Sequence, residues 1–283
     1  MATFFNQATL SYSGGTVNSN ITTGEILEVL SATKTAVYDR YSPGSDVTYA
    51  VNIVNSGTIA FTGLTITDDL GAYTFGTSTL QPLDYIVGSV RYFIDGILQP
   101  APAVTIGPPL VISGINVPAG GTTTILYAAQ ANNFAPLNVE GTIVNTVTIN
   151  GGGITPLTAT ETVSAEAEPR LTITKSVSPT TVTENSQLTY TFVIQNTGNV
   201  PADATDAVVV TDTFDPILSN LTVTYNGAVW TSPANYTYNE ATGQFATVPG
   251  NITVPAATYT QDPTTGVWIV DPGVAVITVT GTI

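Results

Sequence analysis

Residues 32–57, ATKTAVYDRYSPGSDVTYAVNIVNSG, recur later in the chain as residues 172–198, TITKSVSPTTVTENSQLTYTFVIQNTG. In both copies the lysine precedes the tyrosine of the following alternating strand by 15 residues: Lys34 to Tyr49 and Lys175 to Tyr190. The lysine also precedes the Asn of an Asn-x-Gly turn by 21 residues in both copies. Such a shared register indicates two homologous domains rather than chance.

Each copy has the pattern of short β-strands joined by tight turns. Apolar residues alternate with polar ones after a proline-containing turn, and an Asn-x-Gly turn ends the strand. The apolar positions are Val47, Tyr49, Val51 and Ile53 in the first copy, and Leu188, Tyr190, Phe192 and Ile194 in the second. The pattern predicts an all-β protein made of two tandem Ig-like β-sandwich domains.

Composition excludes several classes of function. The chain has 283 residues, no Cys and no His, which excludes disulfides and thiolate or imidazole chemistry. Its net charge of −15 disfavours nucleic acids and anionic membranes as partners. No stretch is long and apolar enough to span a bilayer, and no signal peptide is recognisable at the N-terminus. We expect no cofactor, no metal and no conventional enzyme activity.

The end of each domain sets the expected domain organisation. In the first domain residues 122–130 form the penultimate strand, residues 141–150, GTIVNTVTIN, form the closing strand, and residues 151–169 form a connector. In the second domain residues 274–283 match the penultimate strand, so we expect its closing strand to be missing. The predicted domains are residues 1–22, a donor strand with a flexible connector, then 23–160 and 161–283.

The N-terminal stretch, MATFFNQATLSY, aligns with that closing strand, and Asn6 falls on Asn145. We therefore expect it to be a lone strand that completes the second domain of a neighbouring copy by strand addition. The expected donor residues are Phe4, Phe5, Asn6, Ala8, Leu10 and Tyr12. Self-completion is the alternative, and it requires the strand to reach back across its own first domain. Head-to-tail addition does not close, so it predicts a fibre whose partner is the chain itself.

The repeat resembles the Ig-like conserved-repeat domains of bacterial surface proteins. It is also similar to the isopeptide-forming domains of Gram-positive pilins and adhesins. Strand alternation places Lys34, Asp68 and Asn145 on the core face, together with Lys175 and Asp212. A buried, unpaired ammonium would be costly, so lysines at these positions need partners.

The resemblance implies a self-reaction between such residues. Burial lowers the lysine pKa, the neutral amine attacks the Asn carboxamide, and a protonated carboxyl moves protons as ammonia leaves. Carried over, Lys34 bonds Asn145 within a chain with Asp68 as the acid. Lys175 bonds Asn6 of the next chain with Asp212 as the acid. The alternative without a bond is a buried Lys–Asp salt bridge. Asp69, Glu25 or Glu28 are alternative carboxylates.

Other sites are less well supported by the sequence. Asp68 with Asp69, or Asp203 with Asp206, offers carboxylates for calcium, but no Asp-x-Asp-x-Asp loop is present. The two tryptophans, Trp230 and Trp268, offer a carbohydrate platform, although core positions are commoner for aromatics in β-sandwiches.

We expect a structural subunit of an extracellular fibre, pilus-like or spore-appendage-like, on a bacterial cell or spore surface. The alternatives are an adhesive or ligand-binding module of a larger surface protein and a surface-layer lattice protein.

Overall fold

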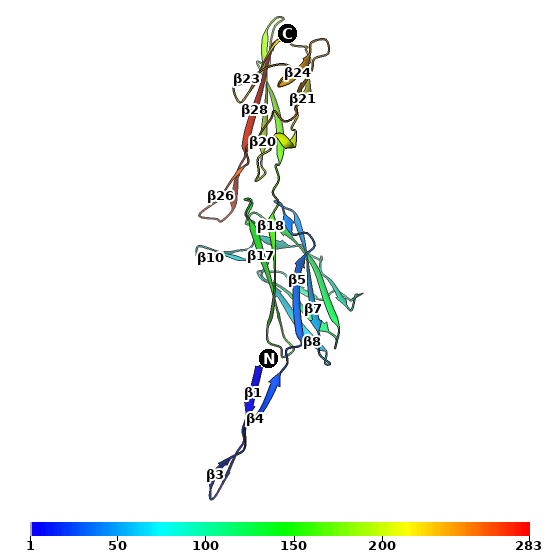
Figure 1. Cartoon of the computed structure of the whole chain (residues 1–283), viewed down its shortest axis with the longest axis vertical. Helices are drawn as coiled ribbons and strands as arrows, with labels where there is room; N and C mark the ends of the chain where they lie inside the picture. Colours follow the sequence, from blue (N-terminus) through cyan, green and yellow to red (C-terminus); the bar gives the residue numbers. More distant parts are fainter. Residues whose placement is uncertain (1) are drawn as a thin grey trace. The chain divides into compact units, whose positions relative to one another are not determined.

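The computed structural model describes residues 2–283; Met1, the first residue of the expected donor strand, lies outside the description, as do the side chains of Ala2 and Ile26. The described residues form strands β1 to β28 and one 3-10 helix, η1 (Ala204–Asp206), which confirms the predicted all-β class (Figure 1). Among these residues, no helix has the length and apolar character needed to cross a membrane.

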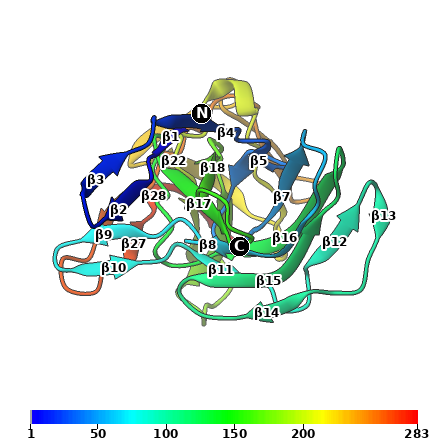
Figure 2. The same ribbon diagram turned by 90° about the horizontal axis from the view of Figure 1, so that it is seen from below.

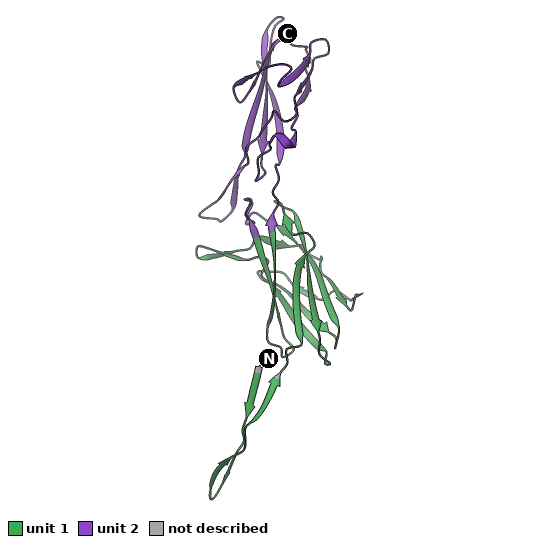
Figure 3. Cartoon of the chain, viewed as in Figure 1, with its two compact units in different colours: residues 1–132, 143–163 green, residues 133–142, 164–283 purple. Residues whose placement is uncertain are grey.

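The chain divides into two compact units (Figure 3). Unit 1 comprises residues 1–132 and 143–163, and unit 2 comprises residues 133–142 and 164–283. The expected boundaries after residues 22 and 160 stay predictions.

Unit 1 contains two large sheets (Figure 2). The first has the order β13 (Ile97–Leu98), β12 (Arg91–Ile94), β16 (Thr122–Ala131), β7 (Asp46–Asn55), β5 (Leu30–Ala36), with β11 (Leu83–Tyr85) also on β16. The second has the order β14 (Ala103–Thr105), β15 (Leu110–Val117), β8 (Phe61–Asp68), β17 (Thr142–Asn150), β18 (Leu157–Ala165), β6 (Arg40–Tyr41). A small hairpin joins β9 (Tyr73–Phe75) to β10 (Ser78–Leu80).

The predicted alternation is what builds this core. Every second residue of β7 is buried, from Val47 to Ile53, and the same holds for β16, where Tyr127 lies opposite Tyr49. A contact between Lys34 of β5 and Asp68 of β8 joins the inner faces of the two sheets. The two sheets therefore face each other as a sandwich.

Unit 2 repeats part of this arrangement. Its larger sheet has the order β19 (Leu171–Ser178), β20 (Gln187–Asn196), β28 (Gly273–Thr282), β22 (Ser219–Tyr225), β23 (Ala228–Trp230). Its smaller sheet has the order β21 (Thr211–Thr213), β25 (Gln244–Thr247), β24 (Tyr236–Asn239), and a hairpin pairs β26 (Thr258–Gln261) with β27 (Trp268–Asp271). Within the described residues, β21 pairs only with β25, so its other edge carries no strand.

The Asn-x-Gly motif has the same structural role in both units. Asn55 is buried; its amide nitrogen donates to the carbonyls of Ile59 and Pro118, and its carbonyl accepts from the Gly57 nitrogen. Asn196 makes the equivalent bonds, donating to the carbonyls of Val200 and Pro255 and accepting from Gly198. Each asparagine thus closes a turn and ties it to a second loop.

Two segments expected to be connectors are strands instead. The N-terminal stretch is a hairpin arm, in which β1 (Ala2–Asn6) pairs with β4 (Thr22–Ile26) and β2 (Thr9–Tyr12) pairs with β3 (Gly15–Asn18). It is therefore not a lone strand followed by a flexible connector. Likewise β18 lies inside the expected connector 151–169. The physical reason is backbone pairing, since a Ser13-Gly14 turn lets the arm satisfy its own N–H and C=O groups.

Candidate functional site

Lys34 lies fully inside unit 1. It projects inward from β5, and none of its side chain is exposed. Its Nζ is 2.9 Å from Asp68 Oδ2 and lies 4.6 Å from the centre of the Tyr49 ring and 5.8 Å from that of Tyr127. The buried Lys34 amine therefore has one carboxylate and two aromatic faces as its surroundings.

Asp68 is held in place from several sides. The Tyr127 hydroxyl donates to Oδ2, the same oxygen that contacts Lys34. The Leu70 nitrogen donates to Oδ1 at 2.7 Å. The alternative carboxylates are placed elsewhere: Asp69 accepts from the Gly71 and Thr146 nitrogens, and Glu25 and Glu28 are exposed.

Asn145 completes this cluster from the neighbouring strand β17. Asp68 lies opposite Val147 in the β8–β17 ladder, and Asn145 is two residues from Val147 on the same buried face. Burial raises the pKa of both Tyr49 and Tyr127, and the nearby Asn145 amide lowers them by a smaller amount. Neither its Oδ1 nor its Nδ2 makes a hydrogen bond of ordinary geometry. A buried carboxamide without partners is costly, so this arrangement needs an explanation.

Burial decides the protonation of the groups around Asn145. It lowers the pKa of Lys34, and the ion pair with Asp68 opposes that shift only in part. Burial also raises the pKa of Tyr49 and Tyr127, so both hydroxyls stay protonated near neutral pH. The cluster thus contains an amine whose neutral, nucleophilic fraction is raised by burial, beside a carboxamide without hydrogen bonds of ordinary geometry.

Unit 2 repeats the lysine and the acid. Lys175 Nζ pairs with Asp212 Oδ2 and lies 4.4 Å from the centre of the Tyr190 ring. The equivalent of Tyr127 is Val279, which lies opposite Tyr190 in the β20–β28 ladder. No asparagine of the described part of unit 2 occupies the place of Asn145, because no strand pairs with that edge of β21.

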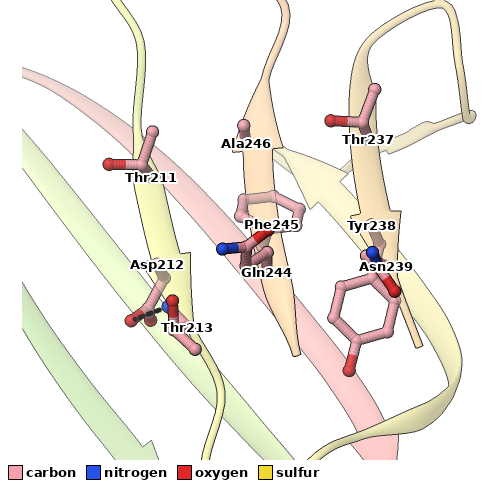
Figure 4. Close-up of a pocket in the computed structure, with 9 residues that line it drawn as sticks. All are labelled: Thr211, Asp212, Thr213, Thr237, Tyr238, Asn239, Gln244, Phe245 and Ala246. Atoms are coloured by element: carbon pink, nitrogen blue, oxygen red, sulfur yellow. Dashed lines mark hydrogen bonds between the residues drawn. The ribbon is translucent and has the colours of Figure 1, made fainter. Parts of the chain in front are cut away.

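This second site is open where the first is closed. The Lys175 side chain is 40% exposed and that of Asp212 is 17% exposed, against 0% and 1% for Lys34 and Asp68. Asp212 also borders an open pocket of about 620 Å³ (Figure 4). The pocket is lined by Thr211, Asp212, Thr213, Thr237, Tyr238, Asn239, Gln244, Phe245 and Ala246.

The expected donor residues lie in the exposed hairpin arm. Asn6 is at the end of β1, opposite Thr22 of β4. The large apolar side chains of the arm are more than half exposed, an unusual state for so many residues in one segment. These are the expected donor residues Phe4, Phe5, Leu10 and Tyr12, together with Val17 and Ile21 of the returning side of the arm; Ala8 is also exposed.

Residues of the alternative calcium and carbohydrate sites have structural roles instead. Asp203 and Asp206 cap η1 by accepting from backbone nitrogens, and Trp230 belongs to the core of unit 2. Within residues 2–283, no cluster of three or more acidic side chains is arranged to hold a metal ion. The two tyrosines beside Lys34 were not singled out as site residues from the sequence, although both occupy inward positions of alternating strands.

No protein-family model matches the chain, and no curated protein matches it. Similar solved structures include the pilus backbone protein RrgB of Streptococcus pneumoniae, with 16% identity and a TM-score of 0.35, covering 86% of this chain and 55% of that one. BcpA, the major pilin subunit of Bacillus cereus, has 11% identity and a TM-score of 0.35, covering 98% and 74%. The collagen-binding subdomain ACE19 of the Enterococcus faecalis surface protein ACE has 10% identity and a TM-score of 0.33, covering 50% and 99%.

Proposed function

We propose that this chain is a structural subunit of a self-assembling fibre on a bacterial cell or spore surface. The N-terminal arm of one copy completes unit 2 of the next, and Lys–Asn isopeptide bonds lock each unit. The observation that carries this proposal is the difference between the two sites. Unit 1 brings a lysine of one sheet against an aspartate and an asparagine on two paired strands of the other, whereas in the described part of unit 2 the lysine and aspartate recur beside a strand edge without a partner.

Within unit 1 the proposed reaction joins Lys34 to Asn145. The neutral Nζ attacks Cγ of Asn145, the new C–N bond forms, and the Cγ–Nδ2 bond breaks. Asp68, in contact with Nζ, carries a proton from the attacking nitrogen to the departing one, which leaves as ammonia. The unpartnered carboxamide supports this reading, because a stable structural asparagine would be hydrogen-bonded.

The cross-link would stabilise unit 1 chiefly through the unfolded chain. By the chain-entropy relation used for disulfides, closing the loop from Lys34 to Asn145 contributes about 4–5 kcal/mol.

Between subunits the arm would supply the edge strand and the asparagine that the described part of unit 2 lacks. With Asn6 placed on Asn145, the other inward arm residues fall on buried positions of β17: Phe4 on Ile143, Ala8 on Val147 and Leu10 on Ile149. Strand addition to β21 would pair its free edge and bring Asn6 to Lys175 and Asp212. An exposed edge of this kind otherwise invites uncontrolled pairing.

The test is denaturing electrophoresis of boiled protein, with a mass measurement on each band. The expected result is a ladder at multiples of 29.3 kDa, with one ammonia missing per internal bond and one per junction. Asn6→Ala or Lys175→Ala should abolish the ladder and keep the internal loss of ammonia. Asn145→Ala, the matched control, should keep the ladder and abolish the internal loss.

A single band of full calculated mass would exclude both isopeptide bonds. Strand-linked fibres would then be judged separately, by electron microscopy of undenatured protein. A monomer under those conditions as well would contradict the fibre itself.

A further inference from the structure

In unit 1 the closing strand, β17, has a second strand paired to its outer edge. The next strand, β18, lies beside β17 in the same sheet, with β6 on its far side. The pairing is tight: the Ala165 nitrogen donates to the Gly141 carbonyl at 2.8 Å, and the hydroxyls of Thr146 and Thr160 are 3.1 Å apart. β18 also contributes to the core through its buried residues Ala159, Val163 and Ala165. The closing element of unit 1 is therefore a two-stranded hairpin.

The N-terminal arm has the same construction. Asn6 lies opposite Thr22, just as the β17–β18 pairing places Asn145 opposite Glu161. β4 therefore stands to β1 as β18 stands to β17, and β3 continues the second strand of the arm with its pairing to β2 offset by one residue. The arm thus repeats both strands of the closing hairpin.

One pair of positions shows a compensated change in side-chain size. Phe4 and Gly24 lie opposite each other in the arm, and the Phe4 ring covers Gly24 so closely that a Cβ there would lie 2.3 Å from it. The corresponding residues of unit 1 are Ile143 and Val163, both buried. One large and one absent side chain replace two medium ones, which keeps the volume offered to a core nearly constant.

The uncovered face of unit 2 has the width of two strands. In unit 1, β5 is the edge of its sheet, and β6 follows it after three residues to pair with β18. Leu157 of β18 borders the same pocket as Leu30 of β5, Glu161 of β18 is close enough to Lys34 to oppose the lowering of its pKa by burial, and Leu30 is only 8% exposed. In unit 2 the counterparts on β19 are uncovered, with Leu171 37% exposed and Ile173 52% exposed. A single strand beside β21 would leave these residues on the inner face of β19 in water.

From these observations we infer that the arm is donated as a closed two-stranded hairpin, to unit 2 of a second copy of this chain. β1 and β2 pair with β21, and β3 and β4 cover β19. The strand formed by β3 and β4 then lies next to residues 181–182, which are the counterparts of β6 in the repeat. Val182 already packs on the core of unit 2. This inference rests on the proposed fibre and specifies its junction.

A closed hairpin has a kinetic consequence. The arm keeps its β1–β4 and β2–β3 backbone hydrogen bonds throughout docking, so assembly does not wait for the arm to open. Donation of a single strand would require those bonds to break first. The two routes therefore differ in their response to a covalent lock across the arm.

The test uses engineered disulfides, for which the chain offers a clean background because it has no cysteine. Ser11 lies opposite Thr16 near the tip, and Thr3 lies opposite Glu25 near the base. All four alternate with the inward residues, so they point away from the docking face. The variants are S11C with T16C and T3C with E25C, each compared in oxidised and reduced form by light scattering and electron microscopy.

The inference predicts that oxidised and reduced forms of both variants assemble at equal rates, within about twofold. It is overturned if the oxidised forms stay monomeric and dithiothreitol restores assembly, since that result requires the arm to open. Failure of the unmodified chain to assemble would instead overturn the fibre on which the inference depends. Using one pair at each end of the arm separates a true block from a local effect of one substitution.

Discussion

At the scale of single residues, the site in unit 1 contains two opposing influences on Lys34. Burial disfavours its ammonium form, whereas Asp68 favours it, and the net result is a lowered pKa. A lysine whose only role is an ion pair would be more stable in an environment that favours its charged form. A lysine that must attack a carboxamide needs the neutral state, and the burial of this site increases the neutral fraction.

The lowered pKa predicts how bond formation depends on pH. The neutral fraction of Lys34 rises with pH and passes one half below 10.5, the ordinary lysine value. Protein recovered unfolded from inclusion bodies, then refolded at a series of pH values, should lose ammonia faster as pH rises from neutral and reach half of its maximum rate below pH 10.5. Mass spectrometry follows the reaction, and circular dichroism checks folding at each pH. A rate that falls with rising pH over this window would contradict the neutral amine as nucleophile.

Tyr127 offers a second prediction at this scale. Its hydroxyl donates to the oxygen of Asp68 that contacts Lys34, so Tyr127→Phe removes one of the bonds that orient the carboxyl group. A hydrogen bond to a charged group contributes about 1.5–3 kcal/mol, so the refolding chain should form its internal bond at least about tenfold more slowly.

The matched control is Tyr92→Phe, which removes a buried hydroxyl that contacts the Asn116 backbone instead. It should lower stability without slowing the reaction. If Tyr127→Phe and Tyr92→Phe form the internal bond at the same rate, the Tyr127 hydroxyl has no role in the reaction beyond packing.

At the scale of elements, the sequence was sufficient for strands that carry their own pattern. The repeat register located Lys34 and Lys175, and large alternating side chains marked strands such as β7 and β20. It was insufficient for β18 and for the β3–β4 side of the arm. Their residues are mostly Ala, Gly, Thr and Ser, which resemble a linker. These strands exist because a neighbour pairs with them, and such context overrides local propensity.

Strand alternation gives the arm a docking face and an outer face, and the two can be tested separately. Leu10→Asp places a charge among residues that should be buried at the junction, which forfeits about 2 kcal/mol of apolar burial and adds a desolvation cost. Assembly should fall at least about tenfold.

Ser11→Asp is the matched control, because it adds the same charge at the next residue on the other face. It should assemble nearly as the unmodified chain does. Light scattering at equal protein concentrations compares the two. Equal inhibition by both variants would show that added charge, rather than the buried face, controls docking.

At the scale of the whole molecule, charge opposes assembly. The chain carries 20 acidic and 5 basic residues, so each subunit has a net charge of −15 and is repelled by the equally charged subunits of the fibre that it joins. The proposed junction itself depends on apolar burial and backbone pairing, which salt does not screen. Added salt should therefore weaken the repulsion and leave the attraction intact.

This reasoning predicts that assembly accelerates with ionic strength. Between 0.01 M and 0.15 M sodium chloride the screening length falls from about 30 Å to about 8 Å, so the lag before light scattering rises should shorten several-fold. Calcium chloride at matched ionic strength is the control. If screening is the cause, the two salts act alike, whereas a much stronger effect of calcium would indicate carboxylates that bind the ion. Slower assembly in salt would mean that an attractive charge pair, and not apolar burial, guides the arm to unit 2.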